Sequence, residues 1–326
     1  MQPMLGLDMS KASFDATLLI NEKKYHQPFE NTPVGFRRLS TWLEKHQVDR
    51  LHACMEATGQ YGEALAEYLH QQNQLVSVVN PARIKAYGQS KFRRNKTDKA
   101  DSELIAQYCL REKPMLWTPP PAILKDLQAL MRRLDDLQSN YQQESNRLQS
   151  GTSMPIVVDN LNEHLTYLKD QIKSIKKAIQ EHIDSHPELQ YNQALLVSIV
   201  GVGKLTAAKI LGEIPNISAF DSARQLAAYA GVTPSNFISG SSVHKKARIS
   251  KMGNSNLRKA LYMSAICAKK HNPIVREFCL RLLAAGKKPM EVICAAMHKL
   301  LHLIYGILKS RKPFDPNFLK KQGFTS

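Results

Sequence analysis

Features of exported and membrane proteins are missing from this sequence of 326 residues. Its N-terminal stretch has no basic segment followed by an apolar core, so it does not predict a signal peptide. A run of about 18 uncharged apolar residues, the length of a membrane-spanning helix, is also missing. The longest apolar stretch, residues 292–308, is interrupted by His298, Lys299 and His302 and predicts a core helix. We therefore expect a cytoplasmic protein.

Cysteine patterns that predict disulfides or zinc are missing too. The five cysteines are odd in number, scattered, and without a pair separated by two residues, which excludes a disulfide framework and a zinc knuckle. The glycine-rich stretch over residues 200–207 lacks the spacing of an ATP-binding P-loop. Its tight turn before a helix is typical of a hairpin that holds a nucleic-acid phosphate, and equally of a plain helix–helix connection.

Acidic residues are scarce in one part of the chain. The whole sequence has 45 Lys and Arg against 28 Asp and Glu, a net charge of +17. Residues 231–326 contain 18 basic residues and only 3 acidic ones, a net of +15, whereas residues 1–230 carry a net of +2. A part with this excess of positive charge indicates a polyanionic partner, and nucleic acid is the partner that we expect.

By its hydrophobic pattern the chain divides into three parts, which we predict to be domains over residues 1–118, 119–189 and 190–326. The first part alternates strand-like apolar stretches with helical spacing. Expected strands are 4–8, 14–20, 24–29, 52–55 and 76–79, and expected helices begin at Thr32-Pro33 and at Tyr61. Three strands, a helix, and then alternating strand and helix is the order of a ribonuclease-H-like mixed sheet with helices.

The other two parts are helical. After Pro119-Pro120-Pro121, apolar residues recur every seventh position from Leu127 to Leu148, and a second seam over residues 161–183 has steps of three and four. These seams predict a coiled-coil arm that pairs with itself or with another subunit. The last part predicts a basic, mostly helical domain that includes a polar loop over residues 233–256.

Four acidic residues of the first part have the placement of metal ligands. Asp8 ends the first expected strand, and Glu56 follows a later one. Asp98 and Asp101 are three residues apart, so a helix would put both carboxylates on one face. Such a set can hold Mg²⁺ or Mn²⁺, and two ions roughly 3.5–4 Å apart can stabilise the attacking and leaving oxygens of a phosphodiester. The alternative is structural, because acids at this spacing are also common on exposed helix faces.

Basic side chains accompany both candidate regions. Arg93, Arg94 and Lys96 stand beside the acids and offer contacts to a phosphate backbone. In the basic part we expect phosphate contacts from six residues: Lys245, Lys246, Arg248, Lys251, Arg258 and Lys259. A run of charges is often only a solvated face, but the net charge of this part favours nucleic acid.

A serine-rich segment lies within the basic part. Residues 237–246 contain Ser239, Ser241 and Ser242 around a glycine, with basic residues following. A serine becomes a nucleophile only when a neighbouring group takes its proton or stabilises its alkoxide, and cations around a scissile phosphate help. By composition alone, the segment is more typical of a flexible linker than of a catalytic loop.

Motifs in both halves resemble the IS110 family of insertion-sequence transposases, which includes Piv-type DNA invertases and bridge-RNA-guided recombinases. The first half matches the family's RuvC-like DEDD domain over most of residues 4–110, at 6–11 (GLDMSK), 56–61 (EATGQY), 80–81 (NP) and 96–101 (KTDKAD). The second half matches its C-terminal transposase domain at 230–234 (AGVTP), 239–242 (SGSS), 251–253 (KMG) and 257–261 (LRKAL). Ser102 stands where the family pattern favours a small residue such as alanine.

The resemblance implies a function and a set of site residues. It implies that Asp8, Glu56, Asp98 and Asp101 bind Mg²⁺ or Mn²⁺, and that a serine attacks DNA to form a covalent phosphoserine link. Ser241 is our candidate, with Ser239 and Ser242 as alternatives of register. The implied partners are donor and target DNA, a structured guide RNA, and further copies of the chain in a dimer or tetramer joined by the arm. The implied setting is the bacterial cytoplasm, at the nucleoid.

Three other interpretations of the sequence stay open. A site-specific invertase of the same family would share every motif. A RuvC-like nuclease would hydrolyse branched DNA with metal-bound water and without a covalent intermediate. A scaffold that binds chromatin or RNA would carry the acids for structural reasons only.

Overall fold

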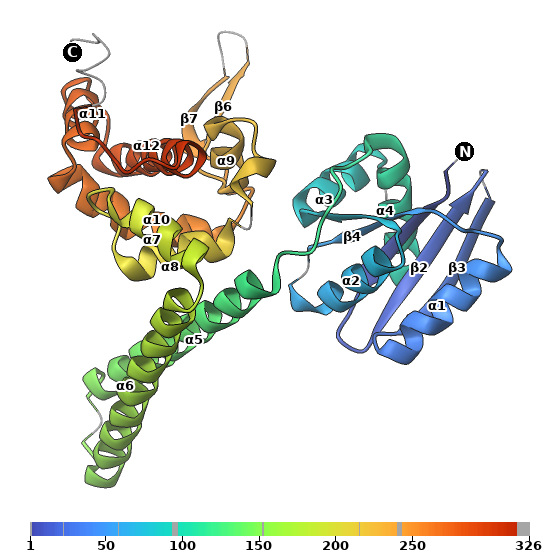
Figure 1. Cartoon of the computed structure of the whole chain (residues 1–326), viewed down its shortest axis with the longest axis horizontal. Helices are drawn as coiled ribbons and strands as arrows, with labels where there is room; N and C mark the ends of the chain where they lie inside the picture. Colours follow the sequence, from blue (N-terminus) through green and yellow to red (C-terminus); the bar gives the residue numbers. More distant parts are fainter. Residues whose placement is uncertain are drawn as a thin grey trace. The chain divides into compact units, whose positions relative to one another are not determined.

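The computed structural model describes residues 2–21, 23–57, 59–92, 97–151, 153–214, 216–239 and 243–317. The chain forms two compact units, residues 1–119 and 120–326 (Figure 1). The second unit contains both the segment predicted as an arm and the basic part.

The first unit is built on a five-stranded mixed sheet in the order β3-β2-β1-β4-β5. Its strands are β1 (Met4–Met9), β2 (Ser13–Ile20), β3 (Lys23–Glu30), β4 (His52–Glu56) and β5 (Leu75–Val79). The first three strands are antiparallel neighbours, whereas β4 runs parallel to β1 and β5 runs parallel to β4. The mixed sheet expected from the sequence is confirmed.

Helices cover both faces of this sheet because the strands alternate two sets of apolar side chains. Leu5, Leu7 and Met9 point to one face and pack with α1 (Pro33–Lys45) and α2 (Glu63–Gln71). The other face meets α3 (Pro81–Ser90) and α4 (Asp98–Glu112) through a cluster that includes Met4, Cys54 and Ile105. A short 3₁₀ turn, η1 (Gln60–Gly62), precedes α2.

Gly6 sets how closely α4 approaches the sheet. A Cβ at this position would lie 2.0 Å from the carbonyl oxygen of Ser102 and 2.4 Å from the backbone nitrogen of Ala106. Ser102 is fully buried there, and its hydroxyl lies 2.8 Å from that of Thr17, the cross-strand partner of Gly6. The hydroxyl of Ser102 therefore ties α4 to β2.

Adding a methyl group at Gly6 is expected to destabilise the first unit. Because Gly6→Ala collides with helix backbone rather than with a movable side chain, we expect a loss of about 3 kcal/mol in the free energy of unfolding. Denaturant unfolding followed by circular dichroism measures it. The control is Gly88→Ala in α3, whose added Cβ meets only the flexible Leu104 side chain at 3.0 Å. An equal loss in both variants would contradict the close approach of α4.

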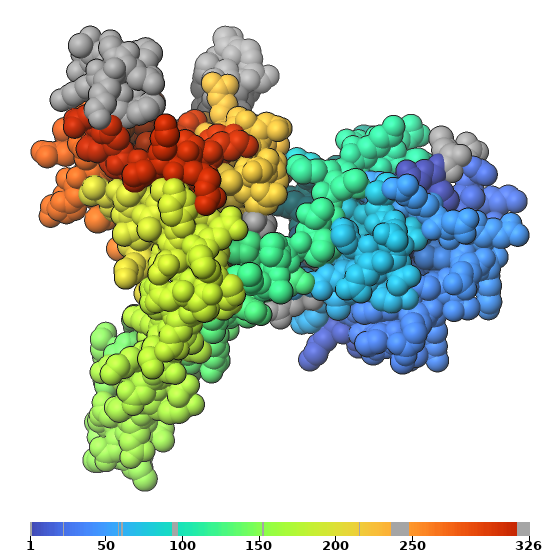
Figure 2. Space-filling view, viewed as in Figure 1, coloured from blue at the N-terminus to red at the C-terminus, as the bar shows by residue number. Residues whose placement is uncertain are grey.

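The second unit begins with two long helices, α5 (Ala122–Gln149) and α6 (Pro155–Asp184), which pack side by side as a hairpin (Figure 1). The far half of this hairpin projects from the rest of its unit (Figure 2). Its near half belongs to the core of the unit, because Leu127, Met131 and Ile183 share one apolar cluster with α7 (Pro187–Val197) and α8 (Lys204–Glu213). An Asp135–Lys209 ion pair also joins α5 to α8.

The remaining elements are η2 (Ile217–Ala219), α9 (Ala223–Tyr229), the strands β6 (Pro234–Ser239) and β7 (Val243–Ile249), α10 (Ser255–His271), α11 (Pro273–Ala284) and α12 (Pro289–Ser310). The prediction of a loop over residues 233–256 is wrong for most of its length. Residues Pro234–Ser239 and Val243–Ile249 pair as an antiparallel ribbon with an irregularity between Ser235 and Phe237. Phe237, Ile238 and Val243 favour strands, although the many polar residues between them hide the alternation.

Helix α12 is the core helix that its interrupted apolar run predicts. It is the one helix in the described part of the chain that is long and apolar enough to cross a membrane. However, Val292, Leu300 and Ile304 are fully buried in the core of the second unit, and the helix packs against α9, α10 and α11. Its apolar character is explained by this packing.

Candidate active site

Asp8 and Glu56 lie at the same end of two neighbouring strands. The parallel register pairs Leu7 of β1 with Met55 of β4, so the acids are the next residue on each strand. Side chains alternate along a strand, and Leu7 and Met55 pack on the face covered by α1 and α2. The two carboxylates therefore belong to the opposite face, the one that α4 covers. Both residues are partly buried.

Asp98 and Asp101 occupy the first turn of α4. The N-cap is Thr97, whose hydroxyl oxygen accepts a hydrogen bond from the backbone N–H of Ala100 at 3.2 Å. Asp98 is therefore not the capping residue, and it is exposed, whereas Asp101 is partly buried. One turn after Asp98, Ser102 packs over Gly6, which precedes Asp8 by two residues on the same strand. The start of α4 thus lies over the end of the sheet that carries Asp8.

The chemistry of these four side chains fits a hard divalent cation, because Mg²⁺ prefers carboxylate oxygens. Their assembly is incomplete: within the residues that the structure describes, no three or more His, Cys, Asp or Glu side chains are grouped closely enough to hold a metal ion. Two carboxylates come from adjacent strand ends and two from the helix above. Asp8, Glu56, Asp98 and Asp101 would hold such a cation, and their roles as ligands remain a prediction.

Asp15 and His26 lie beside the acids and were not predicted from the sequence. Asp15 is the cross-strand partner of Asp8, so both side chains belong to the same face of the sheet. Two carboxylates directly opposite each other repel. His26 Nε2 lies 2.7 Å from Asp15 Oδ1, and both side chains are about one-fifth exposed (20% and 18%). The histidine holds Asp15 in place and offsets the crowding of negative charge when it is protonated.

Two buried thiols lie under the site without taking part in it. Cys54 precedes Glu56 by two residues on β4 and packs with Cys109 of α4. A hydrogen bond with Cys109, together with burial, raises the pKa of the Cys54 thiol well above its ordinary value, so Cys54 stays protonated. Cys109 also lies 3.8 Å from the carbonyl oxygen of His52. We assign this pair to packing between α4 and the sheet.

The predicted serine and several predicted basic residues lie outside the described residues. Ser241, Ser242, Arg93, Arg94 and Lys96 belong to this group. Ser239 and Val243, the described residues on either side of residues 240–242 in the sequence, pair with each other in the β6–β7 ribbon. Lys245 and Lys246 lie on β7, but their side chains are also outside the described ones. The predicted roles of these residues are not tested by the structure.

The other basic residues predicted to bind phosphate differ in their surroundings. Arg248, Lys251 and Lys259 are exposed. Arg258 is partly buried, and its Nη1 donates to the carbonyl oxygen of Ala230 at 3.0 Å. Its guanidinium therefore supports the turn after α9, whatever else it contacts.

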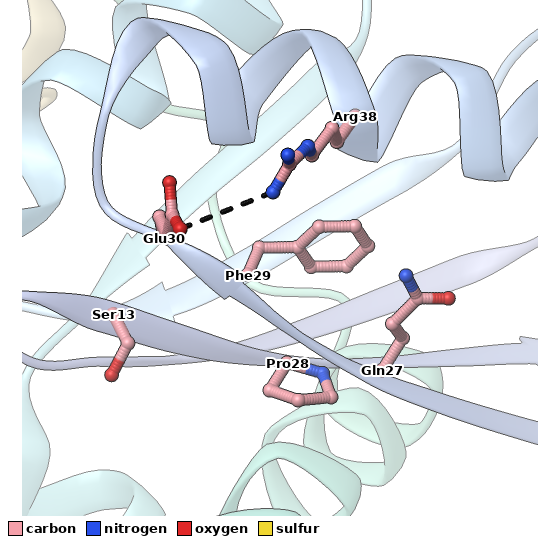
Figure 3. Close-up of a pocket in the computed structure, with 6 residues that line it drawn as sticks. All are labelled: Ser13, Gln27, Pro28, Phe29, Glu30 and Arg38. Atoms are coloured by element: carbon pink, nitrogen blue, oxygen red, sulfur yellow. Dashed lines mark ion pairs between the residues drawn. The ribbon is translucent and has the colours of Figure 1, made fainter.

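A groove on the first unit lies apart from the predicted residues. It measures about 320 Å³ and follows the edge strand β3, where Phe29 is flanked by the Glu30–Arg38 ion pair (Figure 3). Its remaining lining residues are Ser13, Gln27 and Pro28. The groove contains none of the predicted acids, and we assign it no role.

Comparison with protein families decides the identity of the chain. Residues 5–151 match the model of the IS110-type DEDD transposase, and residues 193–280 match the model described as the transposase IS116/IS110/IS902 family. A pilin gene-inverting protein of Moraxella lacunata is 35% identical over 314 residues, which cover 95% of this chain and 97% of that protein. The chain belongs to the IS110 family of transposases. It is accordingly an enzyme of DNA recombination.

A more distant relative of this IS110-family enzyme is named as a transposase. The transposase for insertion sequence element IS1328 of Yersinia enterocolitica is 24% identical over 229 residues, covering 62% of this chain and 66% of the relative. Among solved structures, T. thermophilus RuvC in complex with a Holliday junction substrate aligns with 36% of this chain and all of its own, at 11% identity and a TM-score of 0.29.

Proposed function

We propose that this enzyme cuts and rejoins DNA at a site where metal-bound carboxylates and a serine act together. The observation that carries the proposal is the β1–β4 register, which brings Asp8 and Glu56 to one end of the sheet beneath the first turn of α4. Asp98 and Asp101 belong to that turn, and in the proposal all four acids close around a cation there. The cytoplasm, where DNA is accessible, is the proposed location.

In this proposal the role of the acids is to hold the metal ions. Asp8, Glu56, Asp98 and Asp101 would bind Mg²⁺ or Mn²⁺, which would supply positive charge to the phosphate oxygens during strand cleavage. The exposed side chain of Asp98 and the partly buried one of Asp101 fit ligands that close around a cation when DNA arrives. Arg93, Arg94 and Lys96, next to Asp98 in the chain, contact the phosphate backbone.

Ser241 is the proposed nucleophile. Its hydroxyl oxygen forms a bond to phosphorus as the bond from phosphorus to the leaving sugar oxygen breaks, and the serine proton leaves to a base or to that oxygen. The resulting phosphoserine linkage conserves the energy of the broken phosphodiester bond, which is then available for rejoining the DNA strands. Support comes from the sequence of residues 239–242 and from the neighbouring basic residues Arg248, Lys251 and Lys259, which are exposed. Lys245, Lys246 and Arg258 complete the proposed phosphate contacts.

Trapping the covalent intermediate tests this proposal directly. The full chain is incubated with DNA carrying its element ends and Mg²⁺, and the reaction is stopped with detergent. We expect a protein–DNA adduct whose peptide, identified by mass spectrometry, carries the modification on Ser241. Cleaved DNA with free ends and without adduct would favour hydrolysis by metal-bound water, the alternative mechanism.

A structured RNA is the proposed source of sequence recognition. The second unit supplies positive charge over many elements, and phosphate contacts of this kind bind nucleic acid without regard to sequence. Base pairing by an RNA would provide the missing specificity. Sequencing the RNA that co-purifies with the enzyme tests this: one structured species encoded beside the gene supports guidance, whereas a random mixture contradicts it.

Inversion of a fixed DNA segment is the second candidate function. It is favoured by the pilin gene-inverting relative, which aligns along nearly the whole chain. An assay with a plasmid that carries the DNA flanking the gene distinguishes transposition from inversion. Excision or insertion of an element indicates transposition, and reversal of an adjacent segment indicates inversion.

The α5–α6 hairpin is the proposed contact between subunits. Met154, Ile156 and Val157, near the connection between the two helices, have exposed fractions of 61%, 68% and 40%. Apolar side chains grouped at the end of a projecting arm favour burial against a second copy. Multi-angle light scattering of the purified enzyme should give a dimer or tetramer.

A further inference from the structure

Asn31 joins the two segments that leave the sheet after Asp8 and Glu56. Its side-chain Nδ2 donates to the carbonyl oxygen of Ser10 at 3.0 Å and to that of Tyr61 at 2.9 Å. Ser10 follows Asp8 by two residues, and Tyr61 follows Glu56 by five. Both N–H donors of one amide are therefore used on segments that are far apart in the sequence but adjacent to the two acids.

The side chain of Asn31 joins the two segments near the point where the backbone pairing between β1 and β4 stops. The β1–β4 ladder ends at the Leu7–Met55 pair. Beyond it β1 turns towards β2, whereas the chain after β4 leads to η1. Asn31 connects these diverging segments, and it is itself fixed, because its backbone N–H donates to the carbonyl oxygen of Ala12 at 2.9 Å.

The packing of η1 against β1 and β4 agrees with strand ends that are held in fixed positions. A Cβ on Gly62 would lie 3.1 Å from Sδ of Met55 and 3.5 Å from Cγ of Met9. These methionines directly neighbour Glu56 and Asp8 in the chain. The 3₁₀ turn therefore rests on the opposite side of the same two strand ends, and the Asn31 amide joins its middle residue, Tyr61, to the β1–β2 turn.

We propose that Asn31 is a positioning residue that fixes the spacing between Asp8 and Glu56. The inference rests on the proposed function, in which both carboxylates bind a divalent cation. Ligands whose supporting segments are already ordered lose less freedom when the cation binds, so metal affinity depends on the hydrogen bonds that hold those segments. Asn31 contacts neither the cation nor DNA in this proposal. It acts only through the two segments that it joins, the one with Ser10 after β1 and the one with Tyr61 after β4.

Metal affinity measured on the full chain without DNA tests the proposal. Asn31→Leu keeps the size of the side chain and removes both donors, and Asn31→Ala removes the side chain as well. We expect each to raise the dissociation constant for Mg²⁺, measured by isothermal titration calorimetry, by about tenfold. Since Asn31 is only partly buried, the melting temperature should fall only slightly.

Gln74 provides the matched control. It is also partly buried, and its amide joins two segments of the same sheet at the other end: Nε2 donates to the carbonyl oxygen of Asp49 at 3.0 Å, and Oε1 accepts from the N–H of Leu51 at 2.9 Å. Gln74→Ala should lower the melting temperature to a similar extent and leave the Mg²⁺ affinity unchanged.

The outcomes separate this inference from the function on which it rests. Mg²⁺ affinity equal to that of the wild type in both Asn31 variants overturns the positioning role alone. Equal weakening by Gln74→Ala also overturns it, since the effect would then follow from lost stability. If the wild type and Asp8→Asn bind Mg²⁺ equally weakly, the metal-dependent function fails and the inference fails with it.

Discussion

Asp8→Asn is expected to lower the rate of DNA strand cleavage by about a thousandfold, corresponding to about 4 kcal/mol of lost transition-state stabilisation. The amide keeps the size of the side chain but removes the negative charge that a cation needs. Asp8 is partly buried at the end of β1, next to Asp15 across the strand pair, so the substitution also relieves repulsion between carboxylates. Circular dichroism checks that the variant keeps the fold of the wild type. Cleavage of labelled element-end DNA over a Mg²⁺ series measures the effect.

The control for Asp8→Asn is Asp159→Asn on α6, which removes one exposed carboxylate from the other unit. That variant should cleave DNA like the wild type. DNA binding by Asp8→Asn, measured by fluorescence anisotropy, should be retained because the basic residues are unchanged. A DNA cleavage rate of Asp8→Asn equal to that of the wild type would contradict the metal-site assignment. The acids would then have a structural role.

Ser241→Ala is expected to eliminate the covalent protein–DNA adduct and to reduce recombination by on the order of 10⁴-fold or more. Alanine has no oxygen to attack phosphorus, so no phosphoserine can form. Adduct formation is followed on denaturing gels with end-labelled DNA, and recombination by a plasmid assay with sequencing of the junctions. Folding should be unaffected, because the change removes one hydroxyl oxygen.

Ser239→Ala and Ser242→Ala serve as the comparison for Ser241→Ala. They should keep both the adduct and recombination if Ser241 is the nucleophile, and loss of the adduct in only one of them would move the assignment to that serine. Cleavage without adduct in all three variants and in the wild type would instead support hydrolysis. The three variants together therefore identify both the residue and the type of chemistry.

The strands of the first unit were predictable because short apolar or alternating stretches are separated by clear turn signals. The expected strand over residues 4–8 is β1 apart from one residue at its end, and Asn80-Pro81 does mark the end of β5. The resemblance to the IS110 family, based on short motifs, is confirmed along nearly the whole chain. Local apolar patterns and turn signals were enough for the strands, and the family rested on the resemblance of the short motifs.

The neighbours of the acids were not predictable, because they depend on register and on contacts between distant segments. No sequence pattern indicates that Asp15 faces Asp8, since this follows from how the β1–β2 turn sets the pairing. Gly6 belongs to a motif, but the sequence does not indicate that α4 packs closely against it. That contact is evident only in the structure, where Ser102 lies over Gly6. The β6–β7 ribbon was missed because polar residues interrupt its alternation.

The inner turns of α5 and α6 are part of the apolar core of the second unit, and this has a consequence for how the hairpin can vary. Because the near half of the hairpin is packed into this core, a force on its outer end is transmitted to the basic helices around α8. Whole helical turns can be added or removed at the outer end, where few side chains are buried, without disturbing the base. The reach of the hairpin is therefore adjustable independently of the stability of the unit that carries it.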